Sequence, residues 1–413
     1  MKRDILIYFS GKIIPALVNL AIIVLGIRFL GGEEYGRYSL IFYATMLVST
    51  LTFGWIQHSI LRFLSSYKTD TKNALNHFFH LMLASSGTGV IIMLLLGHFY
   101  FHLPPYSLLI VLFYTFMYNV LLFRLTVWQA AMKPVKYAVF EGIYNFILLL
   151  VLLLLIYAFA IHKFTIIFMA MSAGLVFAEI GRWLFINGEE ERLDYFTFFF
   201  DREFTKKAMG YGLSITLWLL LSYLMNIADR YIIKEYDTYA AVGTYSAIKD
   251  LFFKISSFST IAILLSYNPK VMDSWNNGRK REAGKYIREA LMLEGVVFGV
   301  VFILFLATKD FLYTKVLHLE QGDLLLVSLS LIGSAFLWQI ALFVNKPLEL
   351  LFKQRYMIFA ILFCMLLNIG LNLIFVPQYG IKAASVISFI SSLLYVILVF
   401  GLSLFFISKR KDP

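Results

Sequence analysis

Charged residues are scarce in this chain of 413 residues, of which Asp, Glu, Lys and Arg make up 15%. A soluble domain carries about 25%. Hydrophobic residues reach 60%, and they form runs of roughly 20, the length that an α-helix needs to cross a bilayer. The runs do not alternate in polarity as the strands of a membrane barrel would. The composition therefore predicts an all-α polytopic membrane protein rather than a soluble domain.

Other absences narrow the chemistry. The chain has a single cysteine, Cys364, so no internal disulfide is possible. It has no GxxxxGK[ST] loop, which argues against an on-board ATPase. His77 and His80 lack an acidic third ligand, and no nucleophile stands at catalytic spacing from a base. We therefore expect no metal, no cofactor and no enzymatic activity.

Twelve predominantly apolar stretches are expected to span the membrane. Roughly, they cover residues 10–30, 38–61, 76–98, 106–131, 137–160, 164–186, 207–228, 240–266, 286–307, 323–344, 356–376 and 380–407. Proline and glycine residues lie between the stretches, as in Pro104-Pro105 and Asn268-Pro269. These residues are expected to end the helices, because proline removes a hydrogen-bond donor and glycine permits unusual dihedrals.

Basic residues are distributed unevenly over the expected loops. An even number of spans puts both termini on one side, and that side holds 23 of the 36 Lys and Arg residues, against 7 on the other side. The positive-inside rule then predicts cytoplasmic termini. The net charge of +11 has the same origin, and no basic soluble domain exists to bind nucleic acid.

A short sequence echo divides the chain into halves. Gly36-Arg-Tyr-Ser39 returns almost half a chain later as Gly243-Thr-Tyr-Ser246, each time where the second span of its half opens. This repeat predicts two pseudo-symmetric six-helix lobes around a central cavity, over residues 1–186 and 207–413. Residues 187–206 mix aromatic and charged side chains, which suits a cytoplasmic interfacial helix, although an ordinary loop is the alternative.

Charged residues inside the spans are the best pointers to a site, because each costs about 2.5–3.5 kcal/mol at mid-bilayer. The excess is basic, which suits an anionic ligand such as phosphate. Substrate binding is assigned to six basic residues: Lys12, Arg28, Arg62, Arg124, Lys249 and Lys254. For each of them, snorkelling to a headgroup or pairing with another helix is the alternative reading. Three acids are weaker candidates for ion coupling: Asp229, Asp250 and Glu294.

Several turns resemble those of the polysaccharide flippases of the multidrug/oligosaccharidyl-lipid/polysaccharide exporter superfamily. They are Arg28–Ser39 after helix 1, Gln129–Pro134 between helices 4 and 5, Asp229–Ile233 with Val242–Ser246 between helices 7 and 8, and Val376–Ala384 between helices 11 and 12. One departure is Lys382, where the family usually has glycine. The resemblance implies alternating access by two lobes and oligosaccharides carried on polyprenyl pyrophosphate. By motif position, only Arg28 and Arg62 carry over as cavity residues.

The combined expectation is a flippase for lipid-linked oligosaccharide. Its partners would be that substrate, membrane lipids, a coupling cation (H+ or Na+) and polysaccharide polymerase machinery. One alternative is a drug/cation antiporter of the same superfamily, which would need unpaired acids in its cavity. Others are a membrane-embedded polymerase or acyltransferase and a non-transporting scaffold. A polymerase usually needs a large outer loop, whereas the longest here is roughly 308–322.

Overall fold

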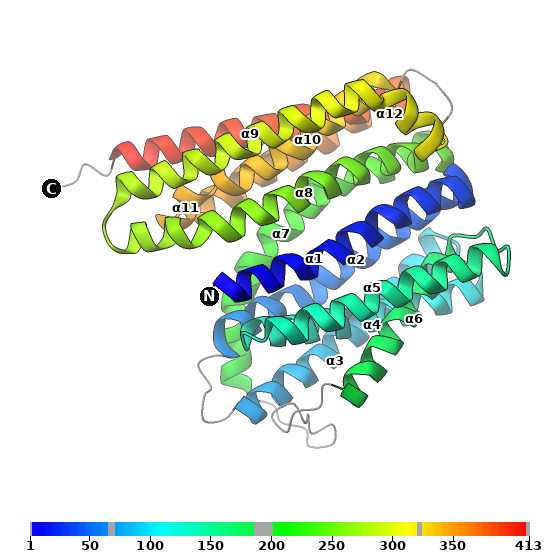
Figure 1. Cartoon of the computed structure of the whole chain (residues 1–413), viewed down its shortest axis with the longest axis horizontal. Helices are drawn as coiled ribbons and strands as arrows, with labels where there is room; N and C mark the ends of the chain where they lie inside the picture. Colours follow the sequence, from blue (N-terminus) through cyan, green and yellow to red (C-terminus); the bar gives the residue numbers. More distant parts are fainter. Residues whose placement is uncertain (1, 65–70, 186–200, 320–323, 410–413) are drawn as a thin grey trace. The chain divides into compact units, whose positions relative to one another are not determined.

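The computed structural model describes residues 2–64, 71–185, 201–319 and 324–409, and these form a helical protein (Figure 1). In the first half, the helices are α1 (Lys2–Leu25), α2 (Gly31–Phe63), α3 (Thr71–Leu95), α4 (Pro105–Ala130), α5 (Pro134–Tyr157) and α6 (Thr165–Phe185). In the second half they are α7 (Arg202–Tyr236), α8 (Tyr239–Asn276), α9 (Lys280–Phe311), α10 (Leu325–Val344), α11 (Lys346–Leu350) and α12 (Gln354–Lys409). Short π-helical turns extend α1, α3 and α9: η1 (Gly26–Leu30), η3 (Leu96–Tyr100) and η5 (Leu312–Val316).

The prediction of twelve spans is confirmed. Within the described residues, nine helical stretches are long and apolar enough to cross a membrane, and two of these, Gly11–Phe63 and Gln354–Ser408, run for 53 and 55 residues. Each of those two is twice the length of one span, since about 20 residues suffice. Non-helical dihedrals mark the division, at Gly31 (φ 82°) and Gly380 (φ 55°). α8 is not among the nine stretches, but its 38 residues are long enough to supply the twelfth span.

The proline signals gave mixed results. Pro105 and Pro134 open α4 and α5 as predicted, since the first helical position has no use for the missing N–H. Pro269 was expected to end a helix, but α8 continues through it to Asn276. The prediction was wrong because a helix tolerates an internal proline where neighbouring groups satisfy the freed carbonyls. The turn comes instead at Gly278, whose φ is +76°.

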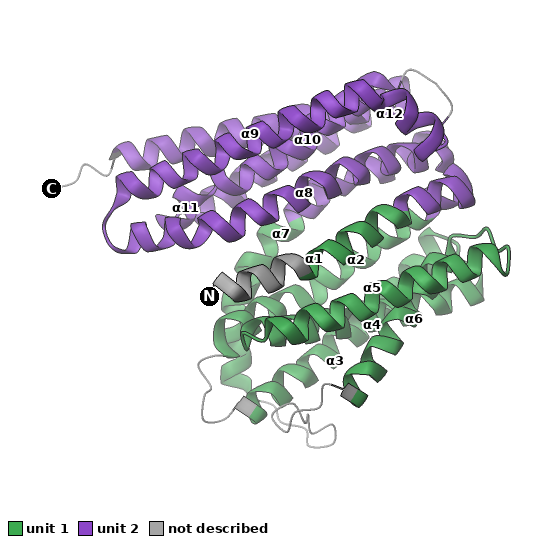
Figure 2. Cartoon of the chain, in the orientation of Figure 1, with its two compact units in different colours: residues 1–22, 38–220 green, residues 23–37, 221–413 purple. Residues whose placement is uncertain are grey.

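The chain forms two compact units that do not follow the sequence order (Figure 2). Unit 1 comprises Met1–Ile22 and Tyr38–Leu220, and unit 2 comprises Ile23–Arg37 and Leu221–Pro413. Compared with the lobes expected from the sequence, each half lends one segment to the other unit. Most of the expected linker, residues 187–200, lies outside the described residues.

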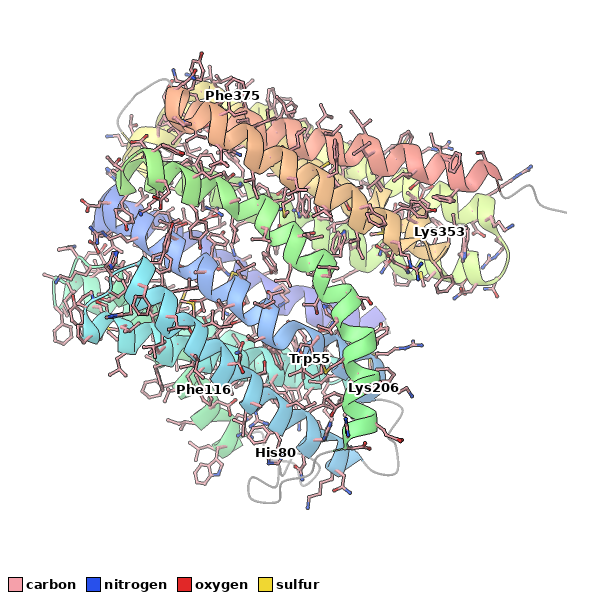
Figure 3. The ribbon with its side chains drawn as sticks, turned by 180° about the vertical axis from the view of Figure 1, so that it is seen from behind. Trp55, His80, Phe116, Lys206, Lys353 and Phe375 are labelled. Atoms are coloured by element: carbon pink, nitrogen blue, oxygen red, sulfur yellow. The ribbon has the colours of Figure 1, made fainter. Side chains whose placement is uncertain are left out.

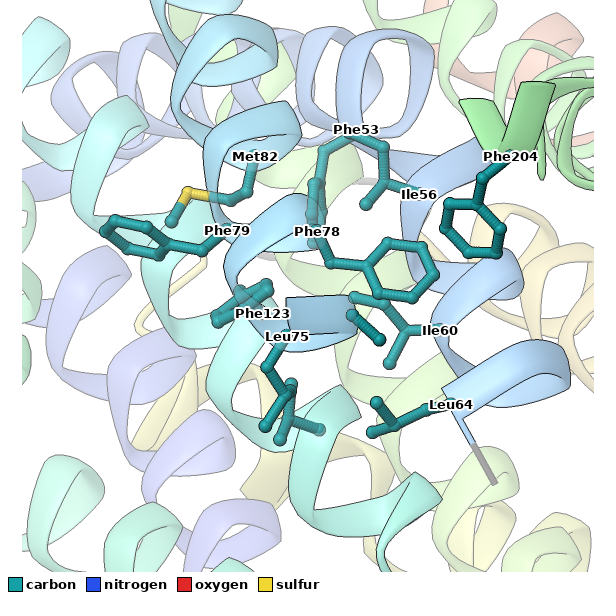
Figure 4. Close-up of a cluster of buried hydrophobic side chains, with 12 residues drawn as sticks. Phe53, Ile56, Ile60, Leu64, Leu75, Phe78, Phe79, Met82, Phe123 and Phe204 are labelled. Atoms are coloured by element: carbon teal, nitrogen blue, oxygen red, sulfur yellow. The ribbon is translucent and has the colours of Figure 1, made fainter. Parts of the chain in front are cut away.

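An aromatic and aliphatic core explains why the beginning of α7 belongs to unit 1. Phe204 packs with Phe53 and Ile60 of α2, Phe78 of α3 and Phe123 of α4 (Figure 4). Trp55 of α2 and Lys206 of α7 are labelled in Figure 3, in the region where these two helices approach each other. A Cβ atom on Gly212 of α7 would lie 2.1 Å from the Trp55 carbonyl oxygen. Burial of these side chains therefore fixes α7 against α2.

In unit 2, the two copies of the sequence echo touch each other. A Cβ atom on Gly243 of α8 would lie 1.9 Å from the carbonyl oxygen of Gly32. A Cβ atom on Gly36 would lie 2.0 Å from the carbonyl oxygen of Tyr239. Only glycine permits such an approach of two backbones. The repeated glycine is therefore the residue that lets Ile23–Arg37 pack against α8.

Candidate functional site

In unit 1, Lys12 has an ion-pair partner from a distant part of the sequence. Its Nζ donates to Oε1 of Glu141 at 2.7 Å and to the hydroxyl of Tyr137 at 2.7 Å. Both partners lie on α5, so the contact joins α1 to α5. The carboxylate compensates the ammonium charge in an apolar setting. Lys12 and Glu141 are 129 residues apart in the sequence, so their pairing is not visible from local spacing.

Arg124 of α4 also forms an ion pair. Its Nε lies 3.2 Å from Oε1 of Glu179 on α6, and the other carboxylate oxygen of Glu179 accepts from Arg182 at 2.7 Å. The Glu179–Arg182 contact confirms the pairing that their three-residue spacing predicts. Because one carboxylate serves two arginines, this cluster keeps one net positive charge.

Arg28 and Arg62 differ from these residues because their side chains are exposed. Arg28 lies in η1 and Arg62 in the last turn of α2. Each guanidinium lies near an aromatic ring, 5.5 Å from that of Phe29 and 5.9 Å from that of Tyr211. Among the described residues, no carboxylate lies within ion-pair distance of either arginine. Both remain available to an anion.

Unit 2 holds a buried network of charges between α7 and α8. Lys249 donates to Asp229 at 2.5 Å, and Arg230 donates to Asp250 at 2.5 Å. Tyr245 donates a further hydrogen bond to Asp229. All five side chains are buried, and the two acids balance the two bases. Arg230, which the sequence placed in an outer loop, is therefore part of a neutral internal network.

The exchanged segment joins this network through one residue. The hydroxyl of Tyr35, in the first turns of α2, lies 3.4 Å from Oδ2 of Asp250. Tyr35 is 1% exposed. The charges of α7 and α8 thus help to hold Ile23–Arg37 within unit 2.

Lys254 lies one turn beyond this network on α8, with a half-buried side chain. Asp250, four residues earlier, acts on it electrostatically. Three residues further along the same helix face is Ser257. Lys254 therefore lies between the charge network and the polar residues of mid-α8.

Glu294 of α9 is a different kind of acid from Asp229 and Asp250. It is 0% exposed, and no basic side chain lies within ion-pair distance among the described residues. Its Oε1 lies 2.9 Å from the hydroxyl of Thr260, whereas its Oε2 has no hydrogen-bond partner in the described part of the chain. A buried carboxylate without a counter-charge is strongly disfavoured. It is stabilised when it binds a proton, which neutralises it, or a cation.

The hydroxyl of Thr260 indicates where such a proton would be. Thr260 lies within hydrogen-bond distance of the Ser256 carbonyl oxygen, at 2.8 Å, as well as of Glu294. A hydroxyl has one proton to donate. Both contacts are satisfied when Thr260 donates to Ser256 and a protonated Glu294 donates to Thr260.

A pocket with a volume of about 320 Å³ lies beside Thr260, within unit 2. Phe253, Ser257 and Thr260 line it from α8, and Trp338 and Gln339 line it from α10. The Nε2 of Gln339 donates to the hydroxyl of Ser257 at 3.0 Å. Ile261, Leu264 and Leu342 complete the lining, so the pocket combines aromatic and aliphatic side chains with two hydroxyls and one amide.

The histidines have structural contacts. His77 lies 3.0 Å from the hydroxyl of Thr205 and accepts from the backbone N–H of Asp201 at 3.3 Å, which ties α3 to the start of α7. His80 contacts the carbonyl oxygen of Asn76 at 2.7 Å. Across the described ranges, no group of three His, Cys, Asp or Glu side chains gathers to hold a metal ion.

The substrate-binding role of the six basic residues stays a prediction. The structure gives ion-pair partners to Lys12, Arg124 and Lys249, and it exposes Arg28 and Arg62. Sequence reasoning missed Glu141 as a partner and Trp338 as a pocket residue. A tryptophan beside a glutamine inside an apolar span was the available signal for the pocket.

Comparisons with known proteins agree with this architecture. The sequence matches the family model "Polysaccharide biosynthesis protein" over residues 1–270, while no curated protein matches it. An inward-facing multidrug resistance MATE family transporter of the MOP superfamily is similar in structure, with a TM-score of 0.69 at 16% identity, over 96% of this chain and 100% of the other. The same kind of transporter in an outward-facing conformation gives 0.64 at 17% identity, over 100% and 96%.

A third solved structure is a MOP superfamily transporter from Pyrococcus furiosus, described as having a binding pocket of reverse polarity. Its TM-score is 0.68 at 17% identity, over 100% of this chain and 96% of that one. At such low identities, these TM-scores show a shared fold. The family match covers well over half of the sequence. The chain therefore belongs to the polysaccharide biosynthesis protein family and is a multi-pass membrane protein.

Proposed function

We propose that this transporter moves polyprenyl-pyrophosphate-linked oligosaccharide, a precursor of cell-surface polysaccharide, across a prokaryotic plasma membrane by alternating access. Both termini would be cytoplasmic, as the distribution of basic residues predicts. The carrying observation is that Arg28 and Arg62 are exposed and, among the described residues, lack a carboxylate partner. A guanidinium without a counter-ion is suited to bidentate contact with phosphate.

The family and the structural relatives support the proposal in different ways. The family is described by polysaccharide biosynthesis, which suits a saccharide cargo. One relative is reported to have a binding pocket of reversed polarity and, by its title, a different function. A basic site would likewise separate this chain from transporters of cationic drugs. The division into lobes at 1–186 and 207–413 is part of the proposal.

Glu294 is the acid best suited to ion coupling. Asp229 and Asp250 each form an ion pair with a base at 2.5 Å. Their charges are already compensated, so they have little tendency to bind a proton or a further cation. Glu294 has one hydrogen bond and no counter-charge among the described residues. We assign it the exchange of a proton or sodium ion that gives transport its direction.

The test is transport by the full chain in proteoliposomes. Farnesyl-pyrophosphate-linked N-acetylglucosamine serves as the probe, and its transfer is followed by its accessibility to a membrane-impermeant glycosidase. Arg28→Gln and Arg62→Gln are expected to slow transfer about tenfold each, which corresponds to one charge-assisted contact. Arg28→Lys and Arg62→Lys should retain part of the rate.

Arg37→Gln is the matched control, because Arg37 is paired with Glu33 at 2.9 Å. It should transfer the probe like the unchanged protein. Equal rates in all of these variants would refute the anionic site. Proton-driven export of ethidium from the same vesicles, without transfer of the lipid, would favour the drug/cation antiporter instead. Chemical conversion of the lipid-linked probe into new products would favour a membrane enzyme.

A further inference from the structure

We propose that the pocket between α8 and α10 is a saccharide subsite, which holds one sugar ring of the cargo. This inference rests on the proposed function. It assigns the glycan part of the substrate to residues other than Arg28 and Arg62. α8 and α10 pack against each other within unit 2 (Figure 1). The subsite therefore lies wholly inside one compact unit.

The size of the pocket suits a single ring. Its volume of about 320 Å³ lies near the lower end of the range of about 300–1,000 Å³ for small-molecule sites. Ser257 and Trp338 are only half-buried, so the lining is reached from outside the unit. A whole oligosaccharide would extend beyond it.

The polar lining matches hydroxyl groups rather than ions. Ser257, Thr260 and Gln339 face the pocket, and no charged side chain of the described residues lines it. Gln339 uses its Nε2 on Ser257, which leaves its carbonyl oxygen as an acceptor for a ligand hydroxyl. Ser257 accepts this bond and keeps its own O–H for donation. Donors and acceptors side by side are what a polyhydroxylated ring requires.

The aromatic lining matches the apolar faces of a sugar ring. The ring of Trp338 lies 5.8 Å from that of Tyr395 of α12, tilted by 31°, and the hydroxyl of Tyr395 donates to Asn345 at 3.2 Å. Phe253 lies 5.8 Å from the ammonium of Lys249, which is itself held by Asp229. Each ring is therefore fixed from behind. Rigid aromatic platforms bind flat apolar surfaces at a low cost in side-chain entropy.

The position of Lys254 agrees with a sugar attached to phosphate. Lys254 lies three residues before Ser257, so both side chains project from the same face of α8. In a polyprenyl-pyrophosphate glycan, the first sugar is bonded directly to the pyrophosphate. A lysine one turn from a neutral sugar pocket reproduces this order of groups along one helix.

Other ligand classes fit the pocket less well. A metal ion needs carboxylate, imidazole or thiolate ligands, and a free phosphate is bound best by basic side chains. Among the described residues, the lining contains no acidic, basic, histidine or cysteine side chain. A drug cation would need an acid in the lining. A lipid tail needs no amide or hydroxyl, and burying these against hydrocarbon would carry a desolvation cost.

The test compares the binding of carriers with and without sugar to the full chain in lipid nanodiscs. The probes are farnesyl pyrophosphate and farnesyl pyrophosphate linked to glucose, galactose or N-acetylglucosamine. At least one sugar is expected to tighten binding about tenfold. Gln339→Leu and Ser257→Ala should remove that gain without changing the affinity for bare farnesyl pyrophosphate. Trp338→Phe should retain part of the gain and Trp338→Ala should lose it.

Two readings keep the proposals separate. The affinity for the bare carrier reports on the proposed pyrophosphate site, whereas the gain on adding sugar reports only on the subsite. The matched control is Gln129→Leu, since Gln129 is an exposed glutamine at the end of α4. This variant should keep the gain in affinity that the sugar gives. A bare carrier that binds, with no gain for any of the three sugars, would overturn the subsite alone. A gain that persists in Gln339→Leu and Ser257→Ala would also overturn it.

Discussion

Two consecutive parts of α8 solve the problem of polar groups in a membrane in opposite ways. From Tyr245 to Asp250, each ionisable side chain has a partner on α7 or α2, and the charges sum to zero. Between Phe253 and Thr260, the residues that line a pocket are neutral, and Glu294 on α9, which contacts Thr260, has no ion-pair partner among the residues described. The first part is a closed network, whereas the second has hydrogen-bonding capacity left over.

This difference separates structural from functional polar residues. A compensated network gains nothing from a ligand, because every charge already has its counter-charge. Residues with spare donors and acceptors gain from one. The charges that stand out most in the sequence, such as Lys249, therefore belong to packing. The uncharged polar residues that follow on α8, Ser257 and Thr260, are the better candidates for binding.

The largest effect should come from breaking the closed network. Asp229→Asn leaves Lys249 buried with no counter-charge, and this is expected to cost about 3–5 kcal/mol of unfolding free energy. Titration with SDS, followed by circular dichroism, measures it. The double variant Asp229→Leu/Lys249→Met should recover most of the loss. A single variant as stable as the unchanged protein would show that the network does not hold α7 to α8.

The next effect concerns the glycine that lets Ile23–Arg37 approach α8. Gly243→Ala places a methyl group where the Gly32 carbonyl oxygen lies 1.9 Å away, and overpacking of this kind costs about 1–3 kcal/mol. Gly299→Ala on α9 is the matched control, because no atom of the described residues outside its own stretch of helix lies within 4 Å of its Cβ position. The control should be neutral or more stable by up to about 1 kcal/mol. Equal thermal shifts in the two variants would contradict the close contact.

The sequence predicted the twelve spans because each is a long apolar run, and it predicted the Glu179–Arg182 pair because three residues of helix bring them together. The pair Lys12–Glu141 was out of reach, since 129 residues separate its members. The continuation of α8 past Pro269 was also missed, because a proline removes one hydrogen bond of a helix without always ending it. Arg230 looked like a loop residue only because α7 was expected to end eight residues too early.

A smaller effect should follow from removing the hydroxyl that joins the pocket to Glu294. Thr260→Val preserves the shape of the side chain but deletes its hydrogen bonds to Ser256 and Glu294. The expected loss of unfolding free energy is about 1 kcal/mol. Thr260→Ser, which keeps the hydroxyl, should lose less. The reverse order in an SDS titration would show that the methyl group, and not the hydroxyl, matters at this position.

The smallest effect on stability, and the most informative on mechanism, is expected for Glu294→Gln. If Glu294 carries a proton, glutamine reproduces it: the amide N–H donates to Thr260 and the carbonyl oxygen replaces the unpartnered Oε2. Stability at neutral pH should then change by less than about 0.5 kcal/mol, well below the 3–5 kcal/mol of the network variant. If Glu294 were ionised, removing an uncompensated buried charge would instead raise the melting temperature by several degrees.

Transport completes this comparison, because a permanently neutral side chain cannot exchange a proton or a cation. The Glu294→Gln variant should still bind farnesyl-pyrophosphate-linked N-acetylglucosamine, but an imposed pH or sodium gradient should no longer change its rate of transfer. Asp250→Asn is the paired measurement, since its partner Arg230 lies at 2.5 Å, and it should lose stability while any remaining transfer keeps its gradient dependence. Gradient dependence that survives in Glu294→Gln and disappears in Asp250→Asn would move ion coupling from the open part of α8 to the closed network and reverse the roles given to them here.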